Sequence, residues 1–250
     1  MNIIQKFLTK NDCYKTNRKI TVKGLMIHSV GCEQPKAEVF INGYNKPNLQ
    51  KCVHAFIDGN TGIVYQTLPW NHRAWHCGAS GNNTHIGIEM CEPSTIKYTK
   101  GSQFTDLNPT KTKEVVLRTY NAAVELFAFL CEEYGLDPMK DITGHKEGCK
   151  NGIASNHGDP DHLWEHCGLS MNGFRKAVQA QMKKNGVSTS TKTEKPVSGQ
   201  NSASYKVNVI KTVDVYSAPA VSQIKDKGVY TIVEEKNGYG KLKSGVGWMY

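Results

Sequence analysis

The chain has 250 residues, enough for one large domain or for a medium domain with a small one, and its 38% hydrophobic and 21% charged residues exclude wholesale disorder. No apolar run reaches the ~18 residues of a transmembrane helix, and the N-terminus lacks the apolar segment of a secretory signal peptide, so we expect neither feature. The 31 Lys and Arg outnumber the 22 Asp and Glu, and the net charge of +9 suits a polyanionic partner, either nucleic acid or an acidic envelope polymer.

Short apolar runs and helical periodicity alternate over residues 1–185. Four strands are expected, at residues 24–30, 53–58, 63–68 and 85–91, and a turn at 60–62 joins the middle two. Apolar residues then recur at helical spacing from Thr110 to Tyr134, and Gly135 follows as a C-cap. A second helix with one apolar face is expected over 172–184. Strands interleaved with helices predict an α/β domain in which helices flank a mixed central β-sheet.

The composition changes after residue 185. Residues 186–203 are mainly Ser, Thr, Lys and Gly, which indicates a flexible linker. Residues 204–250 contain neither Cys nor His, and their pattern is typical of a small all-β barrel that breaks off at Tyr250, as a truncated module would. Its short alternating strands are expected at 206–210, 212–216, 229–234, 239–243 and 247–250. The predicted division is therefore a domain at 1–185, a linker at 186–203 and a small domain at 204–250.

Residues that could ligate a metal are confined to the first part of the chain, where all 8 Cys and all 9 His lie between Cys13 and Cys167. A zinc enzyme needs three protein ligands and an open position for water, and His28, His145 and Asp159 can supply such a set. The sequence has no compact zinc spacing such as His-Glu-x-x-His or Cys-x-x-Cys, so spacing alone leaves structural roles open. A plain hydrogen-bonding role at a strand or loop end is the favoured interpretation for His72, His85, His162 and His166.

A series of short motifs follows along residues 20–165. They are Ile27-His28, Val53-His54-Ala-Phe-Ile-Asp58, Gly62-Ile-Val-Tyr-Gln66, Ala74-Trp75-His76-Cys-Gly78, Ile86-Gly-Ile-Glu89, Gly144-His145 and Asp159-Pro160. In content and order they resemble the zinc-dependent N-acetylmuramoyl-L-alanine amidases of type 2, a family that includes the peptidoglycan recognition proteins and many phage endolysins. Residues 204–250 are similar to bacterial SH3-type cell-wall-binding modules, through Val213–Pro219, Asn237–Tyr239 and Gly247-Trp248.

The resemblance implies a zinc site whose ligands are His28, His145 and Asp159. Other third ligands stay open, because His157 or a thiolate from Cys149 or Cys167 could replace Asp159. His157 also stands where many relatives have Lys, so it is the expected catalytic partner of the oxyanion.

The remaining roles come from the same resemblance. Glu89 matches the carboxylate that takes a proton from the attacking water and passes it to the leaving amine. Other branches of the family place a Tyr just before the His of the second motif, but this chain has Val53 there, which favours Glu89 as the base. The residues expected to contact the sugar-peptide substrate are His54, Trp75 and His76.

The implied activity is hydrolysis of the amide bond between N-acetylmuramic acid and L-alanine, with Zn²⁺ as cofactor and lysis of Gram-positive-type cell walls as the outcome. The lack of a signal peptide fits a phage endolysin that is made in the cytoplasm and acts at the wall after release, and a bacterial autolysin exported by another route is the alternative. Two other classes stay open: a peptidoglycan-binding protein without activity, and a wall peptidase with a Cys nucleophile.

Partners and cysteines complete the expectations. Basic residues are spread along the chain without a dense block, which favours peptidoglycan and anionic wall polymers over nucleic acid, and no membrane insertion is expected. In a reducing cytosol the 8 Cys are expected to be free thiols.

Overall fold

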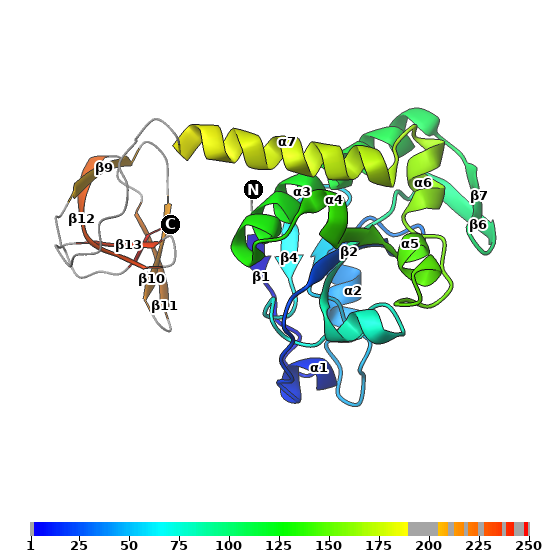
Figure 1. The fold of residues 1–250 in the computed structure, drawn as a ribbon, viewed down its shortest axis with the longest axis horizontal. Helices are drawn as coiled ribbons and strands as arrows, with labels where there is room; N and C mark the ends of the chain where they lie inside the picture. The colour runs from blue at the N-terminus through cyan, green and yellow to red at the C-terminus, as the bar shows by residue number, and fades with distance from the viewer. Residues whose placement is uncertain are drawn as a thin grey trace. The chain divides into compact units, whose positions relative to one another are not determined.

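The computed structural model describes residues 3–189 and six strands between Tyr205 and Met249 (Figure 1). The chain divides into two compact units, Met1–Lys192 and Thr193–Tyr250. Their assignment as a catalytic domain and a wall-binding domain stays a prediction. Helix α7 (Met171–Thr189) covers residues 186–189 of the expected linker, because an established helix gains one hydrogen bond for each residue that it adds. Residues 190–203 lie outside the described residues.

A six-stranded sheet forms the centre of the first unit, in the order β1-β4-β3-β5-β2-β8. Its strands are β1 (Ile3–Gln5), β2 (Gly24–Ser29), β3 (Ala55–Ile57), β4 (Val64–Gln66), β5 (His85–Met90) and β8 (Ile142–Gly144). Strands β3, β5, β2 and β8 run parallel, whereas β4 is antiparallel to β3 and β1 is parallel to β4. The expected mixed α/β fold is thus confirmed. Strands β1 and β8 have 3 residues each, too few for a periodicity to show in the sequence.

Helices, a hairpin and a 3₁₀-helix surround this sheet. They are α1 (Asp12–Lys15), α2 (Ala37–Tyr44), α3 (Pro109–Tyr134), α4 (Pro138–Asp141), α5 (His145–Lys150), α6 (Asp161–His166), η1 (Ser80–Asn83), β6 (Ile96–Lys100) and β7 (Gln103–Asp106). Helix α3 confirms the predicted helix. The Asn108 side chain accepts the N–H of Lys111 at its start, and Gly135 ends it with a φ of 64°.

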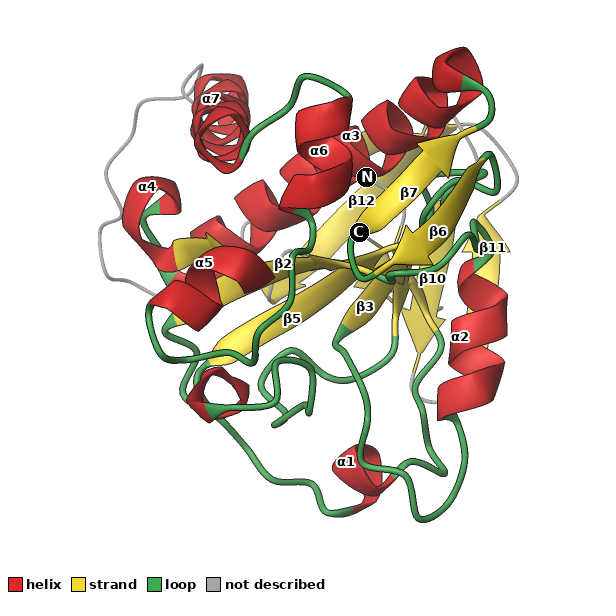
Figure 2. Cartoon of the chain, turned by 90° about the vertical axis from the view of Figure 1, so that its right-hand side faces the viewer, coloured by secondary structure: helices red, strands yellow, loops and turns green. Residues whose placement is uncertain are grey.

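Alternation along the strands separates the two faces of the sheet, with α3 on one side and α2 on the other (Figure 2). The α3 face carries core residues that include Leu25, Ile27, Ile86 and Ile88. On the opposite face, Phe56 of β3 stacks on Phe40 of α2 with ring centroids 5.4 Å apart. His28 and Glu89 are one residue out of phase with the core residues of their strands, so they project from that opposite face.

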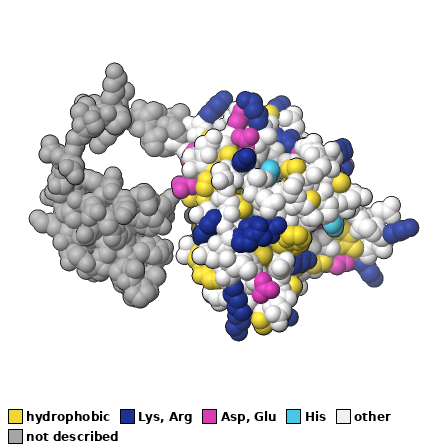
Figure 3. Space-filling view, turned by 60° about the horizontal axis from the view of Figure 1, so that its bottom comes forward, with side chains coloured by type: hydrophobic (Ala, Val, Ile, Leu, Met, Phe, Trp, Pro, Cys, Tyr) yellow, Lys and Arg dark blue, Asp and Glu magenta, His cyan; other side chains and the backbone are white. Residues whose placement is uncertain are grey.

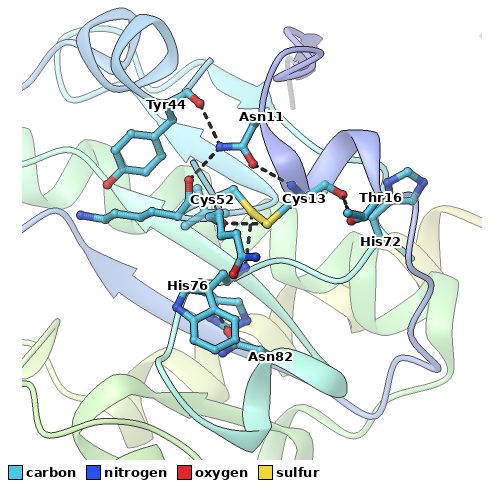
Figure 4. Close-up of a disulfide and its surroundings, with 12 residues drawn as sticks. Asn11, Cys13, Thr16, Tyr44, Cys52, His72, His76 and Asn82 are labelled. Carbon is cyan, nitrogen blue, oxygen red and sulfur yellow. Dashed lines mark hydrogen bonds between the residues drawn. A yellow bond between two sulfur atoms is a disulfide. The ribbon is translucent and has the colours of Figure 1, made fainter. Parts of the chain in front are cut away.

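A disulfide joins Cys13 of α1 to Cys52, with Cα atoms 6.8 Å apart (Figure 4). The expectation of free cysteines is therefore wrong for this pair and holds for the other six. Both half-cystines are buried in a small apolar cluster, and the Asn11 amide donates to the carbonyls of Tyr44 and Lys51 beside it. The two cysteines lie 39 residues apart, so their spacing gives no hint of the pairing.

The described strands of the second unit pair as one antiparallel sheet, in the order β11-β10-β14-β13-β12-β9. They are β9 (Tyr205–Val209), β10 (Val213–Ser217), β11 (Ala220–Ile224), β12 (Gly228–Lys236), β13 (Tyr239–Leu242) and β14 (Trp248–Met249). All but β11 coincide with strands expected from alternation. The identity of this unit as an SH3-type barrel stays a prediction.

The surface of the first unit carries diffuse positive charge. On the face drawn in Figure 3, Lys and Arg side chains are spread among uncharged atoms rather than gathered in one block. This distribution steers a polyanion without defining a single groove for it. None of the helices in the described part of the chain combines the length and the apolar character that a membrane span requires.

Candidate metal centre and active site

The carboxyl ends of neighbouring parallel strands bring polar side chains together. His28 of β2 and Glu89 of β5 are register partners, so both side chains leave the sheet on the same face. Strand β8 pairs with β2 on its other side and delivers His145 directly after its last residue, at the start of α5. Open α/β sheets bind their ligands at the carboxyl ends of their strands, and these three side chains meet there.

Asp159 reaches the same place from the loop between α5 and α6. Its main-chain carbonyl accepts the N–H of Lys146 over 3.2 Å, which ties this loop to the first turn of α5. His28 Nδ1 lies 3.2 Å from Oδ2 of Asp159, and His145 Nδ1 lies 3.4 Å from Oδ1. The two Nδ1 atoms are 3.0 Å apart. One ligand atom from each residue therefore lies within 4.8 Å of the other two, and both histidines are buried.

Electrostatics holds two of these groups in the forms that bind metals. Burial opposes the charged form of Asp159, but its close contacts with His145 and His28 outweigh that effect and hold the pKa of the carboxyl well below its ordinary value. Burial is also the main reason why the pKa of His28 is lowered, with Asp159 acting against that shift. An ionised carboxylate and a neutral imidazole are the ligating forms of these side chains.

Glu89 carries a buried carboxylate oxygen, Oε2, that has no hydrogen-bond partner among the described residues. Burial, followed by the charge of Asp159, raises the pKa of its carboxyl well above the ordinary value, while Lys51 acts in the opposite direction. A carboxyl group with a raised pKa beside a ligand cluster is suited to general acid or base work. Its placement agrees with the role expected for Glu89, which stays a prediction.

The alternative third ligands lie outside the cluster. His157 is exposed, and its ring stands beside that of His145 with centroids 4.6 Å apart. Cys149 is half-buried outside the group, and Cys167 belongs to the main hydrophobic core. The geometry therefore favours Asp159 over His157 and over either thiolate.

His54 is fully buried and uses both ring nitrogens on the backbone. Its Nε2–H donates to the carbonyl of His72 over 2.8 Å, and its Nδ1 accepts the N–H of Gly87 over 3.0 Å. Burial lowers the pKa of His54 to about 4, so the ring is neutral. The expected substrate contact is wrong, because an imidazole with 0% exposure and both nitrogens bonded cannot reach a substrate. His54 instead ties β5 to the segment that follows β4.

His76 is half-buried and contacts the ligand cluster. Its Nδ1 is 2.9 Å from Nε2 of His28, and its Nε2–H donates to the carbonyl of His85 over 3.1 Å. Its main-chain N–H donates to Oδ1 of Asn82 over 2.7 Å (Figure 4). Burial, followed by the charges of His28 and His54, lowers the pKa of His76 well below its ordinary value. His76 therefore contacts a candidate ligand, and the substrate contact expected for it stays a prediction.

Trp75 is an accessible aromatic side chain, as a substrate contact should be. It is 39% exposed, and the guanidinium carbon of Arg73 lies 5.0 Å from its ring centroid. The ring borders a small cavity that Arg18 and Gln50 also line. A ring of this kind offers an apolar face with cationic neighbours to a ligand.

Four other histidines have the hydrogen-bonding roles favoured from the sequence. His72 contacts Lys19, His85 contacts Thr84, His162 contacts Tyr98 and His166 contacts Asp106. These polar partners agree with the hydrogen-bonding roles, which stay predictions.

Glu92, which directly follows β5 and Cys91, is a buried acid that motif analysis misses. It is 0% exposed, and its carboxylate accepts the N–H of Gly31 over 3.1 Å and the hydroxyl of Tyr98 over 2.7 Å. Burial raises the pKa of Glu92 to about 7. In the sequence, Glu92 is visible only as an acidic residue that follows a buried strand. Its two partners, Gly31 and Tyr98, come from other segments, so the sequence does not show the pairing.

Comparison with known proteins identifies the family to which this chain belongs. The sequence profile of the family described as N-acetylmuramoyl-L-alanine amidase matches residues 17–162, more than half of the 250-residue chain. The chain belongs to this amidase family. The matched stretch contains the three clustered residues and Glu89.

Individual relatives of the chain support the fold. N-acetylmuramoyl-L-alanine amidase XlyA of Bacillus subtilis is 27% identical over 107 residues, which are 41% of this chain and 35% of that relative, so only about a third of the curated relative is matched. The solved catalytic domain of XlyA has a TM-score of 0.50 and 22% identity, over 71% of this chain and 99% of that domain. The crystal structure of the Staphylococcus aureus hydrolase AmiA in complex with its ligand gives a TM-score of 0.55 and 20% identity. The match covers 74% of this chain and 86% of that chain. These likenesses establish a shared fold.

Proposed function

We propose that the chain is a zinc-dependent peptidoglycan hydrolase that cleaves the amide bond between N-acetylmuramic acid and L-alanine. The observation that carries the proposal is the convergence of His28, His145 and Asp159 in a member of the N-acetylmuramoyl-L-alanine amidase family. Glu89 stands in register with His28 on the neighbouring strand and adds a proton acceptor to the ligand cluster.

The donor atoms fit zinc. Two imidazole nitrogens and a carboxylate oxygen are ligand types that Zn²⁺ takes in catalytic sites, where three protein ligands leave one position open. With their protons on Nε2, the imidazoles of His28 and His145 direct lone pairs at each other and at the Asp159 carboxylate, and a cation satisfies all three. When bound there, zinc supplies Lewis-acid chemistry, which acidifies a water and polarises a carbonyl oxygen.

The chain's own side chains handle the protons of the reaction. Glu89 takes a proton from the water that attacks the amide carbonyl, and passes it to the amine nitrogen as the carbon–nitrogen bond breaks. The raised pKa of Glu89 suits both transfers, and its unpartnered Oε2 is free to accept from a water. His157 stands beside His145 at the exposed side of the cluster, where its ring can face the developing oxyanion.

The substrate and the site of action follow from exposure and charge. Trp75 contacts the sugar-peptide strand, because its ring is the accessible aromatic side chain of its motif. The net charge of +9 draws the protein to the anionic polymers of Gram-positive-type walls. The second unit binds the wall as an SH3-type module, and the enzyme acts after release from the cell that makes it, as an endolysin does.

Digestion of purified peptidoglycan with and without a chelator tests the proposal. We expect new L-alanine amino termini without new reducing sugars, with activity lost in chelator and restored by Zn²⁺. His28→Ala should abolish digestion and lower the zinc content well below one per chain, whereas His166→Ala, outside the cluster, should do neither. Chelator resistance with sensitivity to thiol reagents would indicate a Cys nucleophile, and no release would indicate a binding protein.

A further inference from the structure

A relay of hydrogen bonds runs from the backbone of β5 through His76 to His28. The carbonyl of His85 can only accept, so Nε2 of His76, 3.1 Å away, carries the proton of that ring. A neutral imidazole has a single N–H, which makes Nδ1 of His76 an acceptor. Nε2 of His28 lies 2.9 Å from this acceptor and is therefore the donor.

The consequence for His28 is that Nε2 holds a proton for His76, which leaves Nδ1 as the nitrogen that can ligate a metal. This atom is the one that lies 3.0 Å from Nδ1 of His145 and 3.2 Å from Oδ2 of Asp159. We propose that His76 is a positioning residue that fixes the tautomer and the ring orientation of His28 for metal binding. The inference rests on the proposed function in taking His28 as a metal ligand.

The surroundings of His76 hold its ring in one orientation. Gly87 of β5 lies directly against the ring, and a Cβ at that position would overlap the imidazole, so glycine is required for this close approach. Asn82 of η1 accepts the main-chain N–H of His76 over 2.7 Å. The buried ring of His54 meets the ring of His76 edge-on, with centroids 6.1 Å apart. Contacts from three segments thus support a residue that acts through its neighbour.

Zinc affinity of the full chain, measured by competition with a chromogenic chelator, tests the inference. His76→Leu keeps an apolar side chain of similar reach but offers no acceptor, and it should weaken zinc binding about 10- to 100-fold. His76→Asn retains an acceptor near the position of Nδ1 and should recover most of that affinity. His85→Leu is the matched control, because it removes an imidazole from the same strand but keeps the carbonyl that His76 uses.

The ring nitrogens of the metal-free chain provide a readout that needs neither metal nor activity. In the wild type, nitrogen-15 NMR should show His28 protonated on Nε2, because His76 accepts there. In His76→Leu, this protonation should be lost in favour of a proton on Nδ1, which Asp159 accepts, while the fold is kept. Gly87→Ala should displace the His76 ring and lower zinc affinity too, so the inference stays testable where His76→Leu does not fold.

Two results would overturn the inference: zinc affinity of a folded His76→Leu within about threefold of the wild type, or an unchanged His28 tautomer in that variant. Equal zinc loss in His76→Asn would also contradict it, because the acceptor is retained there. A chain that passes these tests and yet releases no L-alanine termini would refute the proposed function and leave this inference standing. Failure of the wild type to bind zinc would refute both.

Discussion

Glu92 is expected to make the stability of the first unit depend on pH. Burial raises the pKa of this fully enclosed carboxyl from 4.5 to about 7, so the folded chain holds its proton more tightly than the unfolded chain does. The stabilisation is fully present below pH 4.5 and is lost as the pH rises through about 7. At about 1.4 kcal/mol for each pH unit between the two pKa values, the loss amounts to about 3 kcal/mol.

Glu92→Gln removes the titrating group and keeps its shape. The amide oxygen can still accept the N–H of Gly31, and the amide nitrogen can donate to the hydroxyl of Tyr98. Between about pH 4 and 8, the free energy of unfolding of the wild type should fall by about 3 kcal/mol more than that of the variant. Urea unfolding of the metal-free chain measures this difference through the helical circular-dichroism signal, which among the described residues comes from the first unit.

The control variant is Glu38→Gln, which changes an exposed acid of α2 and should leave the pH dependence as it is in the wild type. Parallel stability curves for the wild type and Glu92→Gln would refute the reasoning, because burial of Glu92 would then contribute no proton linkage. A wild-type curve that falls toward acid relative to the variant would show that Gly31 and Tyr98 favour the carboxylate over its acid.

Three further changes test the site and the fold. Asp159→Asn should leave well under one zinc per chain by atomic absorption, because a neutral amide is a poor ligand, and retained metal would move the assignment to His157. Glu89→Gln should keep zinc but lower turnover about 10²- to 10⁴-fold, since an amide cannot take a proton; a loss of less than about tenfold would place the base elsewhere. Replacing both Cys13 and Cys52 by Ser should cost about 4 kcal/mol in urea unfolding, the loop-closure value for 39 residues; an unchanged midpoint would contradict this.

Local patterns were enough to predict helix α3 and the two strands that carry His28 and Glu89. The apolar periodicity of helix α3, its N-cap at Asn108 and its C-cap at Gly135 all lie within one continuous stretch of sequence. Alternation in β2 and β5 places His28 and Glu89 on the face away from the core, and the paired register then brings them together. These features depend on near neighbours in the chain, which is why the sequence reveals them.

Pairings between distant segments could not be read in the same way. Strand β1 aligns Ile3 with Val64, a partner that only the folded chain brings near. The expectation for His54 failed for a related reason. Its ring bonds the carbonyl of His72 and the N–H of Gly87, and only the folded chain brings these groups near it.

The motif-bearing stretch, residues 17–162, is not a self-sufficient piece of protein. A cut before residue 17 would remove β1 and leave the edge of β4 open, and it would separate Cys13 from Cys52. A cut after residue 162 would strip the core of Trp164 and Phe174, which are 1% and 0% exposed. Bare strand edges and uncovered apolar surface promote aggregation. Shortened versions intended for expression or crystallisation should therefore keep residues 3–189. The two ends of this range complete the sheet edge and the hydrophobic core against which the motif-bearing strands pack.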